Sequence, residues 1–528
     1  MGQLFNACEY LLDRRLDAGD GQRTALTGPA GEVSYAELHD RVCRTAAGLR
    51  ALGLHPEQRL LMVMSDSPHF VVVYLAAMRM GAIPVPVSTM LHADGIAELL
   101  RDSRARLLAV TSDFAAAGAA AAAAAPDLAG ILADVPLAAS IPVHQYDDLA
   151  SAGSSGTVYG TGEDSPAFWL YTSGTTGTPK AAMHRHGSVR VVCETYGTQV
   201  LGIRPEDRCL SAAKAFFAYG LGNSVLFPLA VGAGTVLCPS PSKPDVIAEA
   251  AAKYGATLFF AGPTFFANML RAELPPAALA SVRLAASAGE ALPASLYERW
   301  TGHFGVDLLD GIGMTEMLHI FLSNQAGEVK PGTTGVAVPG YVLKLIDEET
   351  GAEVPDNTPG TLYVRGESAA VGYWSRYDAS RQVFQGQWLR TGDTYTRDAD
   401  GYYACLGRTS DMIKASGIWV SPMEVEARLL THPAVAQAAV VAAPDADGLE
   451  KPVAYVIRQA GAVTTEDELI EYCRQGLPSF KRPRAVVFTD SFPATATGKI
   501  RRVELRKMAE SVLAKPVGSV PPPEAVPS

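Results

Sequence analysis

The sequence predicts an α/β protein with a large N-terminal α/β region, a β subdomain within it, and a small α+β domain at the C-terminus. Apolar runs that fit strands alternate with helical segments before residue 335, most clearly at 168–237 and 257–310. Strand, helix and strand joined by short links are typical of a parallel sheet covered by helices. Beyond residue 335, short strands and turns punctuated by Gly and Pro replace this pattern. A chain of 528 residues is also too long for one core.

The first expected helix covers residues 34–54. Ser34 and Glu37 have the spacing of a capping box, and Gly53 supplies an end signal. Apolar residues recur at helical spacing between these ends, so one face of the helix should be buried.

A strand–helix–strand unit follows this helix. Strands are expected at 60–64 and 83–87, where the chain is continuously apolar. Asp66 and Pro68 are expected to begin the intervening helix, and Gly81 to end it. The short links predict that the two strands are parallel.

A compact block of helices and strands forms the last part of the chain. Ser421 and Glu424 predict a capping box with Pro422 in the first helical turn, and Thr465 and Glu468 predict the start of a second helix. Strands are expected at 436–442, 453–458 and 485–489. This block has the size of an independent domain.

These patterns divide the chain into three parts. We expect a large domain at 1–407 and a small domain at 408–514. The Pro-rich tail at 515–528 has the composition of a disordered segment. No internal repeat is visible.

Composition and charge exclude some classes of partner. The net charge of -11 does not favour a general nucleic-acid binder or a protein that binds anionic membranes. No apolar run reaches the length of a membrane span, and the alanine-rich stretch near 115–125 is expected to form a surface helix. The sequence leaves the oligomeric state open.

Cysteine usage and the N-terminus indicate a cytoplasmic protein. The seven cysteines are an odd, scattered set without close pairs at metal-ligand spacing, which favours a reducing compartment. The first residues include acidic side chains and no long apolar core, so they do not resemble a signal peptide.

The segment from Tyr171 to Lys180 has the chemistry of a polyphosphate cradle. It follows an apolar run at 168–170, and Gly174 and Gly177 let a backbone approach an anion closely. Lys180 adds a positive charge, but the G-K-[ST] ending of a Walker A loop is missing. Four hydroxyl side chains add donors: Thr172, Ser173, Thr175 and Thr176. A flexible linker would not need this order of residues after a buried strand.

Five motifs in this chain resemble, in order, those of the adenylate-forming superfamily, which includes acyl-CoA synthetases, peptide-synthetase adenylation domains and luciferases. They are the loop at 171–180, DGIGMTE at 310–316, Thr391-Gly392-Asp393, Gly407-Arg408 leading to Ser416-Gly417, and Pro493 followed by Gly498-Lys499. The resemblance covers nearly the whole chain and implies ATP, Mg²⁺ and coenzyme A as cofactors.

The resemblance assigns nucleotide-binding roles to matching residues. Glu316 would hold Mg²⁺, a hard cation that prefers carboxylate oxygen, and Thr315 would contact the α-phosphate. Asp393 would accept hydrogen bonds from both ribose hydroxyls, with Arg408 in support. The residues implied around the adenine are Ala288, Gly289, Glu290, Asp310, Gly311 and Ile312.

The resemblance also implies two steps carried out in two conformations. Lys499 would reach the carboxylate and the α-phosphate during adenylation, which requires correct positioning of cations. The small domain would then rotate, bringing Gly417 into the site, where it leaves room for the pantetheine arm of coenzyme A. The usual Asp or Lys at the pivot is replaced by Ser410, with Asp411 next to it, so the hinge residue stays open.

A basic turn in the small domain has two interpretations. Lys481 and Arg482 either meet the phosphates of coenzyme A or form an ordinary solvated turn. The sequence does not separate the two.

Two segments indicate an aryl acid as the substrate. Residues 214–223 and 316–324 resemble benzoate–CoA ligases and their 4-hydroxybenzoate relatives, and aromatic and apolar walls suit a flat ring. Taken alone, the first segment also fits core packing, and the histidine of the second fits a structural histidine. The positions implied to line the ring pocket are Ala218, Tyr219, Gly313, His319 and Ile320.

Three functions remain at this point. The first is an aryl–CoA ligase, and the second is an aryl adenylation enzyme that loads a carrier protein. The third is a non-catalytic nucleotide- or acyl-binding protein, which would have no need to keep Lys499, Glu316 and Asp393 together. The ring substituents, the acceptor and the pathway are not visible in the sequence.

Replacement of Lys499 should separate the two steps. Lys499→Ala is expected to abolish acyl-adenylate formation, because the cation beside the α-phosphate is lost, while pre-made adenylate is still converted to thioester. Gly417→Leu should block thioester formation and spare adenylation. Pyrophosphate release and thioester mass measure the two steps, and an equal loss of both steps in Lys499→Ala would contradict the two-conformation account.

Overall fold

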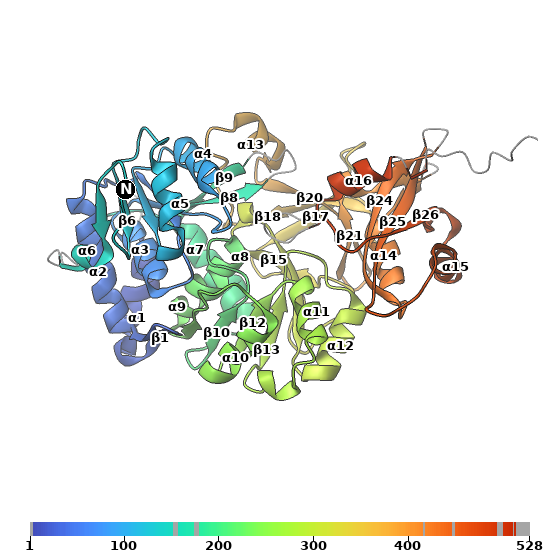
Figure 1. The fold of residues 1–528 in the computed structure, drawn as a ribbon, viewed down its shortest axis with the longest axis horizontal. Coiled ribbons are helices and arrows are strands. Elements are labelled where there is room, and N and C mark those ends of the chain that lie inside the picture. Colours follow the sequence, from blue (N-terminus) through green and yellow to red (C-terminus); the bar gives the residue numbers. More distant parts are fainter. Residues whose placement is uncertain are drawn as a thin grey trace, which may run out of the picture. The chain divides into compact units, whose positions relative to one another are not determined.

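The computed structural model describes residues 4–151, 157–173, 179–415, 418–445, 449–493, 500–510 and 512–513 (Figure 1). The chain forms two compact units. The first contains the described residues up to Lys344, with Tyr363–Thr391 and Asp400–Tyr403. The second contains Leu345–Leu362, Gly392–Ala399 and the described residues from Ala404 onward. The α/β class is confirmed, while the expected domain boundary at 407 stays a prediction.

The first unit contains a five-stranded sheet in the order β4-β3-β5-β6-β7, and every neighbouring pair is parallel. The parallel strand–helix–strand unit predicted for residues 60–87 is therefore confirmed. One core joins the helices α4 and α5 to alternate residues of β3 and β5, such as Leu61 and Leu108, because successive side chains of a strand point to opposite faces. The elements are α2 (Tyr35–Ala51), β3 (Arg59–Val63), α3 (Pro68–Arg79), β4 (Ile83–Pro86), α4 (Ala93–Ser103), β5 (Leu107–Val110), α5 (Ser112–Ala122), β6 (Gly130–Ala133), β7 (Val143–Gln145) and α6 (Tyr146–Ser151).

A nine-stranded sheet forms the second layer of this unit, in the order β16-β15-β14-β13-β12-β10-β11-β1-β2. Its central strands are parallel, and antiparallel pairs close both edges. Figure 1 shows α10, α11 and α12 grouped beside β12 and β13, and their apolar faces share one core around the buried Trp300. The strands are β1 (Thr24–Gly28), β2 (Gly31–Ser34), β10 (Arg208–Ser211), β11 (Gly234–Val236), β12 (Leu258–Ala261), β13 (Leu284–Ser287), β14 (Leu308–Gly313), β15 (Ile320–Ser323) and β16 (Val336–Ala337).

The remaining helices of the first unit are short, apart from those that cover the large sheet. They are α1 (Arg14–Asp17), α7 (His186–Val192), α8 (Ala218–Leu221), α9 (Phe227–Val231), α10 (Pro244–Tyr254), α11 (Pro263–Arg271), α12 (Ala294–Phe304) and α13 (Tyr377–Val383).

An antiparallel hairpin forms a separate two-stranded sheet, and its residues Trp169 and Ala181 belong to the core of the five-stranded sheet. It consists of β8 (Pro166–Ser173) and β9 (Pro179–Arg185), and its strands pair from Pro166 opposite Arg185 to Ser173 opposite Pro179. The apolar run before the phosphate loop is thus a strand, as predicted. Lys180 lies in the returning strand and pairs with Thr172, so it is not part of the loop itself.

The second unit has a three-stranded sheet, in which β24 (Val435–Pro444) and β25 (Glu450–Arg458) are antiparallel and β26 (Ala485–Phe488) is parallel to β25. Helices α14 (Pro422–Leu430) and α15 (Glu466–Gly476) cover one face, and α16 (Arg502–Ala509) covers the other. The expected helices and strands of this block are confirmed. A short hairpin of β22 (Ile413–Ala415) and β23 (Ile418–Val420) precedes α14.

A further five-stranded sheet contributes residues to both units. It contains β17 (Val342–Ile346), β18 (Gly360–Arg365), β19 (Phe384–Gln385), β20 (Trp388–Arg397) and β21 (Tyr403–Arg408). This sheet is the β subdomain expected after residue 335.

The predicted start of α3 is wrong by one residue. Ser67, not Asp66, is the N-cap, and its Oγ accepts from the amide of Phe70 at 3.4 Å. The carboxylate of Asp66 instead accepts from the amide of Ala215 at 3.1 Å. A carboxylate already bonded to a distant amide does not cap its own helix.

The two predicted capping boxes are incomplete, whereas the helix start predicted at Thr465 and Glu468 forms a complete one. Thr465 and Glu468 exchange both hydrogen bonds. Ser34 accepts from the amide of Glu37, but the Glu37 carboxylate pairs with Arg41 at 2.5 Å. Glu424 likewise pairs with Lys481 at 2.7 Å, in place of returning to Ser421. A nearby cation attracts a carboxylate more strongly than a neutral amide does.

The structure also describes the cysteines and the lengths of the helices. Each of the seven cysteines is free. Among the described helices, none is both long and apolar enough to cross a membrane.

The ion pair between Asp13 and Arg79 ties the residue before α1 to the last residue of α3. Arg79, only 2% exposed, donates to both oxygens of Asp13 at 2.7 and 2.9 Å. His39 bonds the same carboxylate at 3.1 Å, and this hydrogen bond raises the pKa of His39 from 6.5 to about 9. The charged His39 therefore stabilises the fold fully below pH 6.5 and progressively less as pH rises to about 9.

Thermal stability should fall between pH 6.5 and 9 because of this interaction. The midpoint of thermal unfolding of the wild-type protein is expected to fall across this window, and His39→Gln should lose most of that fall. The exposed His55 provides the control, and His55→Gln should keep the wild-type profile. A His39→Gln profile that matches wild type would show that Asp13 does not favour the charged histidine.

Candidate functional site

The phosphate loop is held by its two strands. Thr172 and Lys180 face each other in the hairpin, and Ser173 is the last residue of β8. The loop residues Gly174, Thr175, Thr176 and Gly177 lie outside the described residues. The predicted cradle is therefore seen only at its two ends.

Asp102 fixes the position of β8 where it leads into the loop. The hydroxyl of Tyr171 donates to Asp102 Oδ2 at 2.7 Å, and Arg376 pairs with Oδ1 at 2.6 Å. The indole of Trp374 donates to the carbonyl of Asp102 at 2.9 Å. Three chain segments far apart in the sequence thus meet beside the loop, and none of these contacts was predicted.

The carboxyl ends of β13 and β14 bring together two predicted nucleotide segments. Ser287 and Asp310 are paired in these neighbouring parallel strands, and residues 288–290 follow directly. Ligands of open α/β sheets bind at this end of the strands. Gly289 has a φ of +95°, which a side chain at this position would strain. Glu290 accepts from the hydroxyl of Thr264 at 2.9 Å.

Asp310 is a buried carboxyl group with an unused oxygen. It is 4% exposed, and burial raises its pKa well above the usual value. Its Oδ1 has no hydrogen-bond partner in the described part of the chain. A buried acceptor without a partner is costly, and the amino group of an adenine would satisfy it. The role of Asp310 beside the adenine stays a prediction.

Thr315 and Glu316 lie in a tight turn whose backbone is held from outside. The turn, Thr315–Met317, leads to Leu318, which has a φ of 66°. Such a left-handed conformation costs a non-glycine residue about 1–3 kcal/mol. It persists because all three carbonyls of the turn have partners: His184 Nε2 at 2.8 Å from Thr315 O, the amide of Ala370 at 2.8 Å from Glu316 O, and Ser368 Oγ at 2.7 Å from Met317 O.

The carboxylate of Glu316 fits the predicted Mg²⁺ site. Glu316 is buried, and the hydroxyl of Tyr373 donates to its Oε1. Among the described residues, no donor is bonded to Oε2, and no group of three His, Cys, Asp or Glu forms a cage for a metal. Mg²⁺ commonly binds through one or two carboxylates plus substrate phosphates and water, and Glu316 offers such a ligand.

The residues predicted to line the acid pocket come together around His319. Its Nε2 lies 3.2 Å from the carbonyl of Tyr219, and the Tyr219 ring lies 5.4 Å from the His319 ring, centroid to centroid. Gly313 pairs with Ile320 where β14 meets β15, so both adjoin this histidine. Ala218 begins α8, directly before Tyr219. The five predicted positions therefore share one place in the first unit.

His319 is neutral in this aromatic environment. Burial lowers its pKa to about 3. Because Nε2 faces a carbonyl, it carries the proton, and Nδ1 is left as an acceptor without a partner in the described residues. Two further rings enclose it, Tyr196 at 5.3 Å and Phe227 at 4.5 Å. Sequence reasoning missed both, although Phe227 follows closely on the predicted segment.

Asp393 and Arg408 belong to the second unit and form an ion pair of 3.2 Å. Asp393 is mostly buried, while Arg408 is half exposed. Lys481, one of the two candidates for the phosphates of coenzyme A, pairs with Glu424. Ser416, Gly417, Gly498 and Lys499 lie outside the described residues, so their predicted roles stay predictions.

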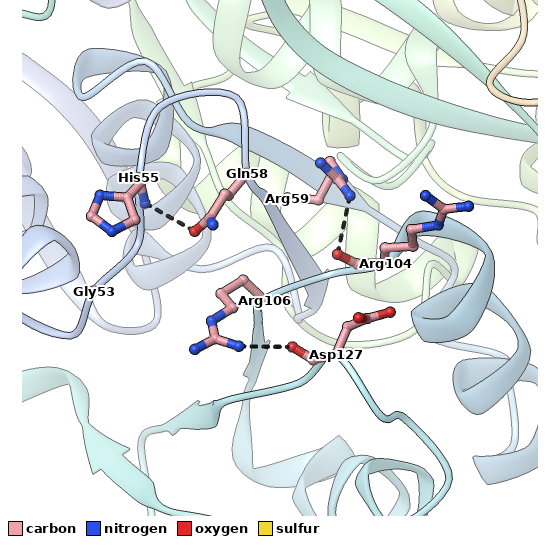
Figure 2. Close-up of a pocket in the computed structure, with 7 residues that line it drawn as sticks. All are labelled: Gly53, His55, Gln58, Arg59, Arg104, Arg106 and Asp127. Carbon is pink, nitrogen blue, oxygen red and sulfur yellow. Dashed lines mark hydrogen bonds between the residues drawn. The ribbon is translucent and has the colours of Figure 1, made fainter.

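A hollow of about 340 Å³ in the first unit lies elsewhere and is not the predicted site (Figure 2). It is found at the amino ends of β3 and β5, where Arg59, Arg104 and Arg106 gather. Figure 2 shows the guanidinium groups of Arg104 and Arg106 pointing away from each other. Arg59 donates to the carbonyls of Glu57, Ser103 and Arg104. These arginines tie strand ends together and do not converge on one anion.

Comparison with known families agrees with this geometry. The family model for AMP-binding enzymes matches residues 13–374, and the model for the AMP-binding enzyme C-terminal domain matches residues 424–499. The chain belongs to the AMP-binding enzyme family. The resemblance inferred from the five motifs is thereby confirmed.

Named relatives within the family point to aryl acids. The chain is 41% identical to the benzoate–CoA ligase of Thauera aromatica, over 95% of this chain and 96% of that protein. It is 40% identical to the 4-hydroxybenzoate–CoA/benzoate–CoA ligase of Rhodopseudomonas palustris, over 99% and 96% of the two chains. The crystal structure of a benzoate CoA ligase from Burkholderia xenovorans superposes with a TM-score of 0.88 at 41% identity, covering 95% of this chain and all of that one.

The contact between Gly222 and His319 should control binding of the acid. A Cβ at Gly222 would lie 2.7 Å from His319 Nε2, so Gly222→Ala should displace the ring. The KM for benzoate is expected to rise roughly tenfold, which corresponds to about 1.4 kcal/mol, whereas the KM for ATP should stay within about twofold.

Gly302→Ala is the matched control, since a Cβ at this helical glycine meets no atom within 4 Å. It should leave both KM values unchanged. Equal rises of both KM values in Gly222→Ala would show a general disturbance of the fold.

Proposed function

We propose that this chain is an AMP-forming aryl acid–CoA ligase, which converts benzoate or a substituted benzoate to the acyl-adenylate and then to the aryl–CoA thioester. The observation that carries the proposal is the continuity of one segment. Thr315 and Glu316, predicted to contact phosphate and Mg²⁺, are separated by only two residues from His319 and Ile320, predicted to line the ring pocket. One tight turn thus joins the nucleotide end of the site to the acid end.

The first half-reaction joins the acid to the nucleotide. A carboxylate oxygen of the aryl acid attacks the α-phosphorus of ATP, and the bond to pyrophosphate breaks. A Mg²⁺ ion on Glu316 would supply positive charge to the phosphate oxygens. Lys180 and Thr172 face each other at the two ends of the phosphate loop, where they suit the departing phosphates. Asp310 and residues 288–290 would hold the adenine.

The second half-reaction transfers the acyl group. The thiol of coenzyme A attacks the carbonyl carbon of the adenylate, loses its proton, and AMP leaves. Asp393 and Arg408 would hold the ribose, and Gly417 and Lys499 would act in the two conformations implied by the family resemblance. These roles belong to the proposal.

The environment of His319 supports an aryl acid with little charge on its ring. Three aromatic rings and a neutral imidazole surround the position, and a charged ring substituent would be desolvated there without an opposite charge. We therefore propose benzoate and neutral substituted benzoates as the acids.

The proposed partners are the aryl acid and coenzyme A, in the cytoplasm. The net charge of -11 gives no support for nucleic acid or an anionic membrane as a partner. Loading of a carrier protein remains the alternative, because it needs the same adenylation residues and a different acceptor.

A panel of ring-substituted benzoates tests the proposal directly. With ATP and Mg²⁺, benzoate should release pyrophosphate, and addition of coenzyme A should give a thioester with the mass of benzoyl-CoA. A phosphopantetheinylated carrier should accept the acyl group poorly in the same assay. Absence of pyrophosphate with every acid would refute the ligase, and a preference for the carrier would establish the alternative.

A further inference from the structure

Tyr373 connects two parts of the candidate site that are far apart in the sequence. Its backbone lies beside β9, where Ala182 and Tyr373 form an antiparallel bridge. The amide of Trp374 donates to the carbonyl of Ala181, and that of Met183 to the carbonyl of Gly372. The segment at 371–374 therefore acts as a third strand next to the hairpin that carries Lys180.

The same segment holds the turn that carries Glu316. The amide of Ala370 donates to the carbonyl of Glu316, and the Tyr373 hydroxyl donates to its carboxylate. Both the backbone and the side chain of Glu316 are thus fixed by residues within three positions of each other. These two hydrogen bonds restrict rotation of the Glu316 carboxylate.

The ring of Tyr373 is itself firmly placed. It is 6% exposed and meets the ring of Phe384 edge to face at 5.4 Å. The ammonium group of Lys180 lies 5.6 Å from its ring centroid.

We propose that Tyr373 is a positioning residue that holds Oε1 of Glu316 and thereby directs Oε2 toward the divalent cation bound with the nucleotide. This inference rests on the proposed function, because it takes Glu316 as the metal ligand. A carboxylate held by one oxygen presents the other in a single direction, which lowers the entropy lost when the cation binds. Lys180, which is predicted to meet the phosphates, lies beside the same ring.

The test measures how strongly Mg²⁺ tightens nucleotide binding. The dissociation constant of α,β-methylene-ATP is determined by calorimetry with and without Mg²⁺, and the ratio of the two values reports the coupling between metal and nucleotide. Tyr373→Phe keeps the buried ring and removes only the hydroxyl. The ratio should fall roughly tenfold, the scale of one hydrogen bond to a charged group, while the Mg²⁺-free constant stays unchanged.

Tyr341→Phe is the matched control. Its hydroxyl bonds Ser368 Oγ at 2.8 Å, and Ser368 supports the same turn through Met317, but neither touches the carboxylate of Glu316. This variant should keep the wild-type ratio. Glu316→Gln should reduce the ratio strongly, and adding Tyr373→Phe to it should cause no further fall, because both changes act on one interaction.

The outcomes separate this inference from the proposed function. The positioning role is overturned if Tyr373→Phe keeps the wild-type ratio. It is also overturned if the loss in the double variant is additive, or if the Mg²⁺-free dissociation constant shifts by the same factor as the constant measured with Mg²⁺. A wild-type protein that binds no nucleotide and releases no pyrophosphate with any aryl acid overturns the proposed function, and this inference with it.

Discussion

The candidate site depends on a turn of three residues, Thr315–Met317, that is hydrogen-bonded to other parts of the chain. Every carbonyl from Thr315 to Met317 is bonded to a group from another part of the chain, and Leu318 closes the turn in a left-handed conformation. The hydrogen bonds from β9 and from the segment at 368–370 help to offset the strain at Leu318. The metal ligand and the acid pocket, which lie on either side of this turn, depend on the same support.

Much of the local structure could be predicted from the sequence. Apolar runs predicted strands of the parallel sheet, and Gly53, Pro68, Gly81 and Pro422 marked ends of α2, α3 and α14. Local cues failed where another partner competed for the same side chain, either far away in the sequence or, for Glu37, four residues along the same helix. Asp66 has the chemistry of a helix cap, but it bonds Ala215, and Glu37 and Glu424 bond nearby cations. A local pattern does not show which charge lies opposite in the folded chain.

The motifs located the ends of the phosphate loop, the adenine segments and the acid pocket, and the structure brings the described parts of each together. The sequence motifs could not reveal residues that act through long-range contacts. Tyr373 lies 57 residues from Glu316, and Asp102 lies 274 residues from Arg376, with no periodic signal in either case. The roles of Lys499 and Gly417 stay predictions, because both residues lie outside the described part of the chain.

The pairing of β1 with β11 has a consequence for how the chain is made. Thr27 pairs with Val236, so the large sheet cannot form at this position until the ribosome has produced both residues. At about 5–20 residues per second, this wait lasts roughly 10–40 s. During that time the five-stranded sheet, whose strands all come from one short stretch of chain, can form before the nine-stranded sheet. The hairpin of β1 and β2 meanwhile keeps an unpaired edge. That edge is where a nascent chain would be most open to aggregation and most in need of a chaperone.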